Sequence, residues 1–210
     1  MTSKKRTALS PDDPEWIEAL KRGEAAAFRV LIERHQRSVY QICLRLMNDR
    51  AEAEDMAQET FIRASQAMEH FRGEASMNTW LYRIAINLCK NRIAYLKRRA
   101  HQFHDHLPKL EETKGDTWQN RARPDDVLGT PDEVAEGNEA QRLINAALQA
   151  LPESLRAVLT LRDLEGLSYQ EIVEVLNIPL GTVKSRLHQA RLQLMKHYQN
   201  FQNGEGDVDP

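Results

Sequence analysis

The sequence predicts an all-α protein made of two small helical domains joined by a flexible linker. Apolar residues recur at steps of three and four over most of the chain, which is the period of one buried helical face. Strand-type runs of Val, Ile and Thr are scarce, and only 6% of the residues are aromatic. Residues 101–138 lose this period and are rich in Pro, Gly and charge, as linkers are. The predicted domains therefore span residues 15–100 and 139–200.

The composition is that of a globular protein without a membrane-spanning segment. Of 210 residues, 41% are hydrophobic and 29% are charged, which is enough apolar material for real cores. No apolar run could cross a bilayer, and the N-terminus leads into no secretory segment. Cys43 and Cys89 lack a CxxC partner and lie among apolar residues, which favours buried free thiols over a disulfide or metal site. We expect a cytoplasmic protein.

The first domain is expected to contain a succession of helices. A short amphipathic helix opens it at residues 16–23, and longer ones follow at 28–46 and about 51–68. Residues 71–78 include Gly73 and small polar side chains, which are typical of a loop. A long helix over about 79–99 completes the domain.

The second domain is expected to end in a helix-turn-helix. Helices start near Glu139 and at Pro152, where a proline suits the first turn. Ser168 and Glu171 have the spacing of a capping box, which predicts a helix from Tyr169. Residues 177–181 contain Pro and Gly and should form a tight turn. Thr182 should cap the last helix, whose expected buried stripe is Val183, Leu187, Ala190 and Leu194.

The polar face of this last helix is basic. No acidic residue occurs between Glu174 and Glu205, and N-terminal residues of such a helix are the ones that reach base edges in a major groove. A solvated helix face is the alternative, but the capped two-helix frame favours DNA. The residues predicted to contact duplex DNA are Lys184, Ser185, Arg186, His188, Gln189 and Arg191.

Two further charged stretches lie in the first domain. Acidic residues crowd positions 49–59, and composition alone favours a solvated helix face there. Between Ala75 and His104 no acidic residue occurs; Arg83, Asn87, Lys90 and Asn91 project from one side, which favours contact with nucleic acid. Trp80 and Tyr82 stand near the start of this helix, where a core position is favoured over a base-stacking platform.

No enzyme or cofactor site is expected. His101, His104 and His106 lie in the linker without a second ligand cluster, which disfavours a metal site. No nucleophile, base and orienting group stand out in the sequence. We therefore expect a protein that binds other macromolecules, with no catalytic residues, metal or cofactor.

Both domains resemble the extracytoplasmic-function (ECF) sigma factors of bacterial RNA polymerase, the sigma-E-like branch of the sigma-70 family. Residues 151–172, 181–187 and Ala190-Arg191 resemble region 4, through stretches such as LRDLEGLSYQEI and GTVKSRL. Residues 49–64 (DRAEAEDMAQETFIRA) and 71–92 (FRGEASMNTWLYRIAINLCKNR) resemble region 2, in the expected order. A helix-turn-helix alone would also fit a LuxR-like dimeric regulator; the first domain distinguishes the two.

The resemblance implies a transcription initiation factor that binds core polymerase, recognises the minus-thirty-five and minus-ten promoter elements and promotes strand opening. Its acidic helix would dock on a coiled coil of the β′ subunit, and the β subunit is also a partner. Asp55, Gln58 and Glu59 match the core-binding motif. The full set of expected core-binding residues is Asp49, Glu52, Asp55, Gln58 and Glu59.

The resemblance also assigns the DNA contacts. The loop at residues 72–78 would capture a flipped base of the minus-ten strand, and the last helix would dock on the minus-thirty-five duplex. The expected minus-ten residues are Arg72, Ser76, Asn78, Trp80, Arg83, Asn87, Lys90 and Asn91. The upstream element often resembles GGAAC in this family, but His188 and Gln189 depart from many relatives and leave the sequence preference open. An anti-sigma factor, whether soluble or membrane-anchored, is a further expected partner.

Overall fold

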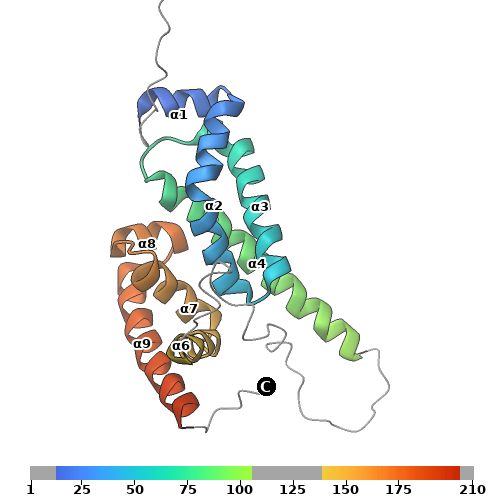
Figure 1. Cartoon of the computed structure of the whole chain (residues 1–210), viewed down its shortest axis with the longest axis vertical. Coiled ribbons are helices and arrows are strands. Elements are labelled where there is room, and N and C mark those ends of the chain that lie inside the picture. The colour runs from blue at the N-terminus through green and yellow to red at the C-terminus, as the bar shows by residue number, and fades with distance from the viewer. Residues whose placement is uncertain (1–12, 106–138, 204–210) are drawn as a thin grey trace, which may run out of the picture.

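The computed structural model describes residues 13–105 and 139–203, and within these ranges it contains helices, turns and short connections but no strand. The N-terminal domain (residues 13–105) and the C-terminal domain (residues 139–203) lie side by side (Figure 1). The all-α prediction is confirmed for these residues. Residues 106–138, most of the predicted linker, lie outside the described residues.

The N-terminal domain follows the predicted order of helices. Its elements are α1 (Pro14–Lys21), α2 (Ala25–Met47), α3 (Arg50–Ala67), the short 3₁₀ turn η1 (Met68–His70) and α4 (Met77–Asp105). Side-chain caps determine where two of these helices begin. Asp13 accepts a hydrogen bond from the amide of Glu15 at 3.0 Å, and Asp49 accepts one from the amide of Glu52 at 2.9 Å.

Helix α4 is longer than the sequence predicted. It begins at Met77 rather than Thr79 and continues to Asp105 rather than ending near Arg99. Its first turn is capped by Ser76, whose hydroxyl accepts from the amide of Thr79 at 3.1 Å. The chain has no Gly or Pro between Gly73 and Pro108, so nothing in its composition breaks the helix at the expected place.

The C-terminal domain contains α6 (Glu139–Gln149), α7 (Glu153–Leu159), the single π turn η4 (Thr160–Leu164), α8 (Tyr169–Leu176) and α9 (Leu180–Gln202). The predicted capping box is confirmed, with both of its hydrogen bonds present between Ser168 and Glu171. Asn177 ends α8 in the left-handed region, at φ 51°.

Two predictions for this domain are wrong in detail. Thr182 does not cap the last helix, because α9 begins at Leu180 and its N-cap is Pro179. A proline can take this place because the N-cap position needs no intrahelical amide donor. Pro152 likewise is the N-cap of α7 rather than a residue of its first turn. The buried stripe Val183, Leu187 and Ala190 is confirmed, and Leu194 is partly buried.

The two domains pack against each other. Helix α4 contacts α8 and helix α2 contacts α7, so that buried apolar residues of both domains form one cluster (Figure 1). We call this packing the closed arrangement. Cys43 and Cys89 are buried free thiols, as expected. Across the described ranges, every helix is too short or too polar to traverse a lipid bilayer.

Candidate nucleic-acid and partner interfaces

The acidic face of α3 presents only some of its carboxylates to solvent. Asp55 and Gln58 are exposed, and the half-buried Glu59 pairs with Arg63 at 2.7 Å. The carboxylate of Glu52 is engaged by Arg92 of α4, and Asp49 is the N-cap of α3. Of the expected core-binding set, Asp55, Gln58 and Glu59 therefore form the accessible row, whereas Asp49 and Glu52 also hold the domain together.

The loop before α4 is polar and open. Arg72 is exposed and lies 4.0 Å from Glu74, and Asn78, which was expected in this loop, is exposed in the first turn of α4. Trp80, by contrast, is only 8% exposed and lies with its ring centre 5.1 Å from that of Phe71. Its expected contact with the minus-ten strand does not fit this buried position, because a stacking platform needs an exposed ring face. The core position that the sequence favoured for Trp80 is confirmed.

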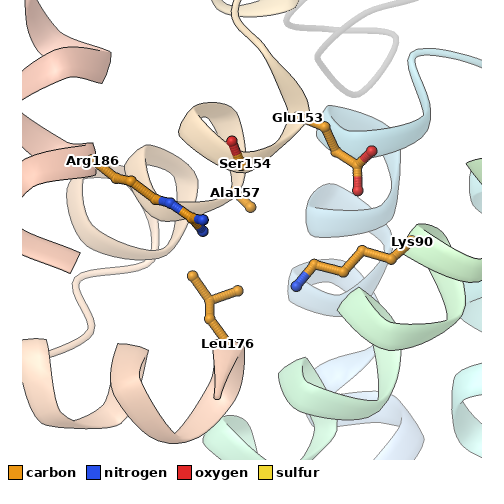
Figure 2. Close-up of a pocket in the computed structure, with 6 residues that line it drawn as sticks. All are labelled: Lys90, Glu153, Ser154, Ala157, Leu176 and Arg186. Atoms are coloured by element: carbon orange, nitrogen blue, oxygen red, sulfur yellow. The ribbon is translucent and has the colours of Figure 1, made fainter. Parts of the chain in front are cut away.

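Farther along α4, the expected DNA-facing residues separate into two groups. Arg83, Asn87 and Asn91 are exposed and recur every four residues, so they share one face. Lys90 is half-buried and points toward the C-terminal domain (Figure 2). Arg83, Asn87 and Asn91 therefore form a polar row that is open to solvent, whereas the Lys90 ammonium is directed between the two domains.

The recognition face of α9 is open to solvent. Lys184, Ser185, His188 and Gln189 are all exposed on this helix. Arg191 is exposed too, but it makes two hydrogen bonds to Asp163, of 2.6 and 3.0 Å, and these bonds raise the pKa of its guanidinium. Arg186 differs from these residues, because it is half-buried and points to the N-terminal domain (Figure 2).

Lys90 and Arg186 meet at a pocket between the domains. Its volume is about 280 Å³, and it is lined by Lys90, Glu153, Ser154, Ala157, Leu176 and Arg186. Figure 2 shows the Lys90 ammonium and the Arg186 guanidinium pointing into this space from opposite sides. Burial lowers the pKa of Lys90; Glu153 opposes that shift, and Arg186 adds to it. Two side chains expected to contact different promoter elements thus face each other here.

A largely covered carboxylate also joins the two domains. Glu165, which follows η4, accepts a hydrogen bond from Arg45 of α2 at 2.9 Å and another from the Tyr82 hydroxyl of α4 at 2.9 Å. The side chains of Arg45 and Glu165 are only 14% and 12% exposed. Burial raises the pKa of Tyr82, and the adjacent Glu165 charge raises it further, so the hydroxyl remains a donor.

Arg156 makes a second junction. Helix α2 ends at Met47, so its last carbonyls have no partner within the helix. The Arg156 guanidinium donates to the carbonyls of Arg45 and Leu46 at 3.3 and 3.5 Å, and also to those of Gln149 and Leu151 within its own domain. Burial lowers the pKa of Arg156 to about 10, well above neutral pH. A cation is thus held at the negative end of the α2 dipole.

Sequence reasoning missed Glu165 and Arg156. Each belongs to a stretch that matched the expected second domain, but its partners in the first domain lie 83 to 120 positions away. A third contact of this kind runs from the Thr79 hydroxyl to the Glu171 carboxylate at 3.3 Å. A charged residue that is covered by protein needs a partner, so knowing that Glu165 and Arg156 are covered would have pointed to these contacts. The periodicity of apolar residues does not show which single polar residue is covered.

The three linker histidines, at which a metal site was disfavoured, lie only partly within the described residues. His101 and His104 fall within the last turns of α4, and His106 lies outside the described residues. Where the structure is described, no three His, Cys, Asp or Glu side chains are grouped so that they could hold a metal ion.

Comparison with known protein families gives one match in each of the two domains. Residues 31–99 match the family model of sigma-70 region 2, and residues 141–194 match that of sigma-70 region 4. The first match spans α3 and most of α4, and the second contains the helix-turn-helix. The presence of region 2 distinguishes the chain from a LuxR-like regulator.

Several curated proteins are similar over nearly their whole length. The RNA polymerase sigma-H factor of Pseudomonas aeruginosa is 37% identical over 89% of this chain and 94% of its own. The ECF sigma-E factor of Haemophilus influenzae is 35% identical over 85% and 91%, and the ECF sigma factor SigW of Bacillus subtilis is 36% identical over 88% and 96%.

A solved structure shares the fold. The sigma factor RpoE of Bartonella quintana, in complex with the anti-sigma factor NepR, aligns with a TM-score of 0.58 at 19% identity, covering 87% of this chain and 98% of that one. Sigma factors are transcription initiation factors rather than enzymes. With both sigma-70 regions matched and relatives of this identity, the chain belongs to the ECF family of RNA polymerase sigma factors.

Proposed function

We propose that the two domains of this sigma factor divide promoter recognition between them. The N-terminal domain binds core polymerase through the exposed row of α3 and holds the opened minus-ten strand along α4. The C-terminal domain docks α9 on the minus-thirty-five duplex. The observation that carries this proposal is the exposed polar row Lys184, His188 and Gln189 on α9, set on a capped helix-turn-helix.

The charge pattern supports a separation of polymerase and DNA contacts. Carboxylates dominate the open face of α3, whereas the open faces of α4 and α9 carry cations and amides. Carboxylates repel phosphates and attract a basic protein surface, so α3 suits polymerase and not DNA. Arg83 of α4 and Lys184 of α9 suit phosphates, and Asn87 offers the paired donor and acceptor that bases require.

The proposal extends to the partners of the protein. Core RNA polymerase, through its β′ and β subunits, and promoter DNA are the required ones, and both are found in the bacterial cytoplasm. An anti-sigma factor is a further partner. The solved relative RpoE supports this, since it was captured with its anti-sigma factor NepR.

Transcription in vitro tests the proposal. Purified protein and core polymerase are given a library of random upstream sequences, and the transcribed templates are sequenced. We expect enriched sequences with two separate elements, and no specific transcripts from either component alone. Enrichment of a palindrome, or specific gel shifts without core polymerase and no transcripts with it, would indicate a dimeric regulator instead and overturn the proposal.

A further inference from the structure

Two cations point into one pocket, and neither forms an ion pair with any residue that the structure describes. We propose that Lys90 of α4 and Arg186 of α9 together bind a phosphate group of a small ligand in this pocket. The site goes beyond the proposed function, which gives the chain only macromolecular partners. In the closed arrangement the two side chains enter the pocket from opposite sides (Figure 2).

The lack of a partner leaves the charges of Lys90 and Arg186 uncompensated. Within residues 13–105 and 139–203, neither side chain makes a hydrogen bond, although each is half-buried and has lost part of its water. Such cations usually gain an acceptor in exchange. Burial lowers the pKa of Lys90; the charge of Glu153 raises it, and that of Arg186 lowers it again. The two cations therefore repel each other, and an anion between them would replace this repulsion with two attractions.

The volume of the pocket limits the ligand to a small anion. It is about 280 Å³. Sites for drug-sized ligands begin at about 300 Å³, and a water molecule takes about 30 Å³. The pocket therefore has room for a phosphate or a pyrophosphate with a few water molecules, but not for a whole nucleotide. Its lining residue Ser154 is exposed, so the pocket is open to solvent and can admit the phosphate end of a larger molecule.

The chemistry of the two side chains favours a phosphate over a carboxylate. The Arg186 guanidinium presents its donors as a planar fork that fits two phosphate oxygens, and the Lys90 ammonium supplies a compact charge for another oxygen. A doubly charged anion also compensates two cations better than a singly charged one. The side chains of Ala157 and Leu176 form apolar walls, which offer the cations no competing acceptor.

Glu153 should limit the affinity of this site. Its carboxylate also lines the pocket, and its charge acts on Lys90. The two cations outnumber the carboxylate, but the carboxylate repels any anion that enters. Neutralising Glu153 should therefore strengthen binding, whereas neutralising either cation should weaken it. A general attraction of anions to the basic faces of the protein would not produce these opposite responses.

Calorimetric titration of the full chain with pyrophosphate tests the site. The titration contains no DNA, so its outcome does not depend on the proposed promoter contacts. Ionic strength is held at about 0.15 M, where exposed charges are largely screened beyond about 8 Å. The wild type should bind one pyrophosphate per chain in a saturable manner. Lys90→Gln and Arg186→Gln should each weaken binding roughly tenfold, and Glu153→Gln should strengthen it several-fold.

Three matched variants neutralise exposed charges outside the pocket: Lys97→Gln on α4, Lys196→Gln on α9 and Glu174→Gln on α8. Each should leave the affinity for pyrophosphate unchanged to within about twofold. Circular dichroism checks that every variant folds. Wild-type affinity in the folded Lys90→Gln and Arg186→Gln variants would overturn the site, as would a wild type that shows no saturable binding.

Parallel titrations with inorganic phosphate, ATP and acetate identify the chemistry of the ligand. Similar affinities for pyrophosphate and ATP would mean that the pocket recognises the phosphate group alone. Tighter binding of ATP would mean a nucleotide whose base and ribose contact residues outside the pocket. Either result supports the site, and inorganic phosphate should bind more weakly than pyrophosphate because it carries less charge. Acetate should bind far more weakly still; acetate binding as tight as that of phosphate would overturn the phosphate assignment.

Discussion

The Glu52 carboxylate and the Arg92 guanidinium form two parallel hydrogen bonds, of 2.6 and 2.8 Å, that join α3 to α4. These bonds are the main reason why the pKa of Arg92 is raised. The paired geometry is the strong form of a carboxylate–guanidinium contact. It connects the helix expected to bind polymerase with the helix expected to bind the minus-ten strand, so one pair helps to set the relative position of both surfaces.

Breaking this pair should destabilise the N-terminal domain slightly. Both side chains are partly exposed, so we expect Arg92→Met to lower the free energy of unfolding by about 1 kcal/mol. A double-mutant cycle with Glu52→Gln, measured by urea denaturation, should recover most of that loss as coupling energy. Additive effects of the two substitutions would show that the contact contributes nothing in solution.

Charge reversal on the open row of α3 should weaken assembly with polymerase. In the variant Asp55→Lys with Glu59→Lys, carboxylates that would meet a basic partner surface become repulsive, and affinity for core polymerase should fall roughly tenfold or more. The measurement is co-purification with core enzyme, followed by titration of labelled protein.

A matched variant separates position from net charge. Glu54→Lys with Glu69→Lys makes the same charge change at exposed residues outside the expected core-binding set, and it should bind polymerase nearly as the wild type does. If the Asp55 variant still co-purifies at wild-type yield, the assignment of this surface is wrong.

Substitution in the recognition helix should reduce promoter-specific transcription. Lys184 is exposed near the N-terminal end of α9, where a base contact is worth about 1–3 kcal/mol. Lys184→Ala should therefore lower transcription from the selected promoter about fivefold or more. Lys196→Ala, on the same helix but beyond the recognition face, should have a smaller effect. Equal effects of the two would argue against direct recognition by Lys184.

Local features of this fold could be predicted from the sequence because they are determined within a few residues. The capping box of Ser168 and Glu171 requires only a hydroxyl and a carboxylate three positions apart. The buried stripe of α9 follows from apolar spacing alone, as does the burial of both cysteines. The family resemblance added functions to these elements without changing their boundaries.

The domain junction could not be predicted in this way. Arg45 of α2 and Glu165, which follows η4, are 120 positions apart, and in the sequence each is an ordinary charged residue. Their pairing depends on how two domains pack, which no local period specifies. The same packing turns Lys90 and Arg186 toward the shared pocket, although both were expected on DNA-facing surfaces. Trp80 shows the converse, since the sequence favoured its core position, whereas its expected contact with the minus-ten strand came from the family resemblance.

The turn between α8 and α9 should tolerate glycine but not a branched residue. Asn177 has φ 51°, in the left-handed region, which Asn and Gly adopt readily. We expect Asn177→Gly to change stability little and Asn177→Val to cost about 1–2 kcal/mol in urea denaturation. Asn203→Val, at the C-cap of α9 with φ −86°, controls for the same chemical change in ordinary backbone. Equal costs at both sites would refute the backbone explanation.

The capping box should make stability depend on pH. The Ser168 hydroxyl and amide bonds lower the pKa of Glu171, and the Thr79 hydroxyl adds to this effect, while burial opposes it. A carboxyl whose pKa is lower in the folded state stabilises the fold at pH values above its unfolded pKa, which is about 4.3. This contribution is lost as pH falls through the folded value, because protonation removes the acceptor charge.

Comparison of the wild type with Glu171→Gln isolates this contribution. At pH 7 the wild type should be more stable by roughly 0.5–1 kcal/mol, since glutamine keeps an acceptor but loses the charge. The difference should shrink as pH falls below about 4.3, because the protonated wild type then resembles the glutamine variant. Glu174→Gln removes an exposed carboxylate from the same helix and controls for the change in net charge. A difference that stays constant between pH 7 and pH 3 would mean that the charge of Glu171 does not contribute, and that the helix cap depends on the shape of the side chain alone.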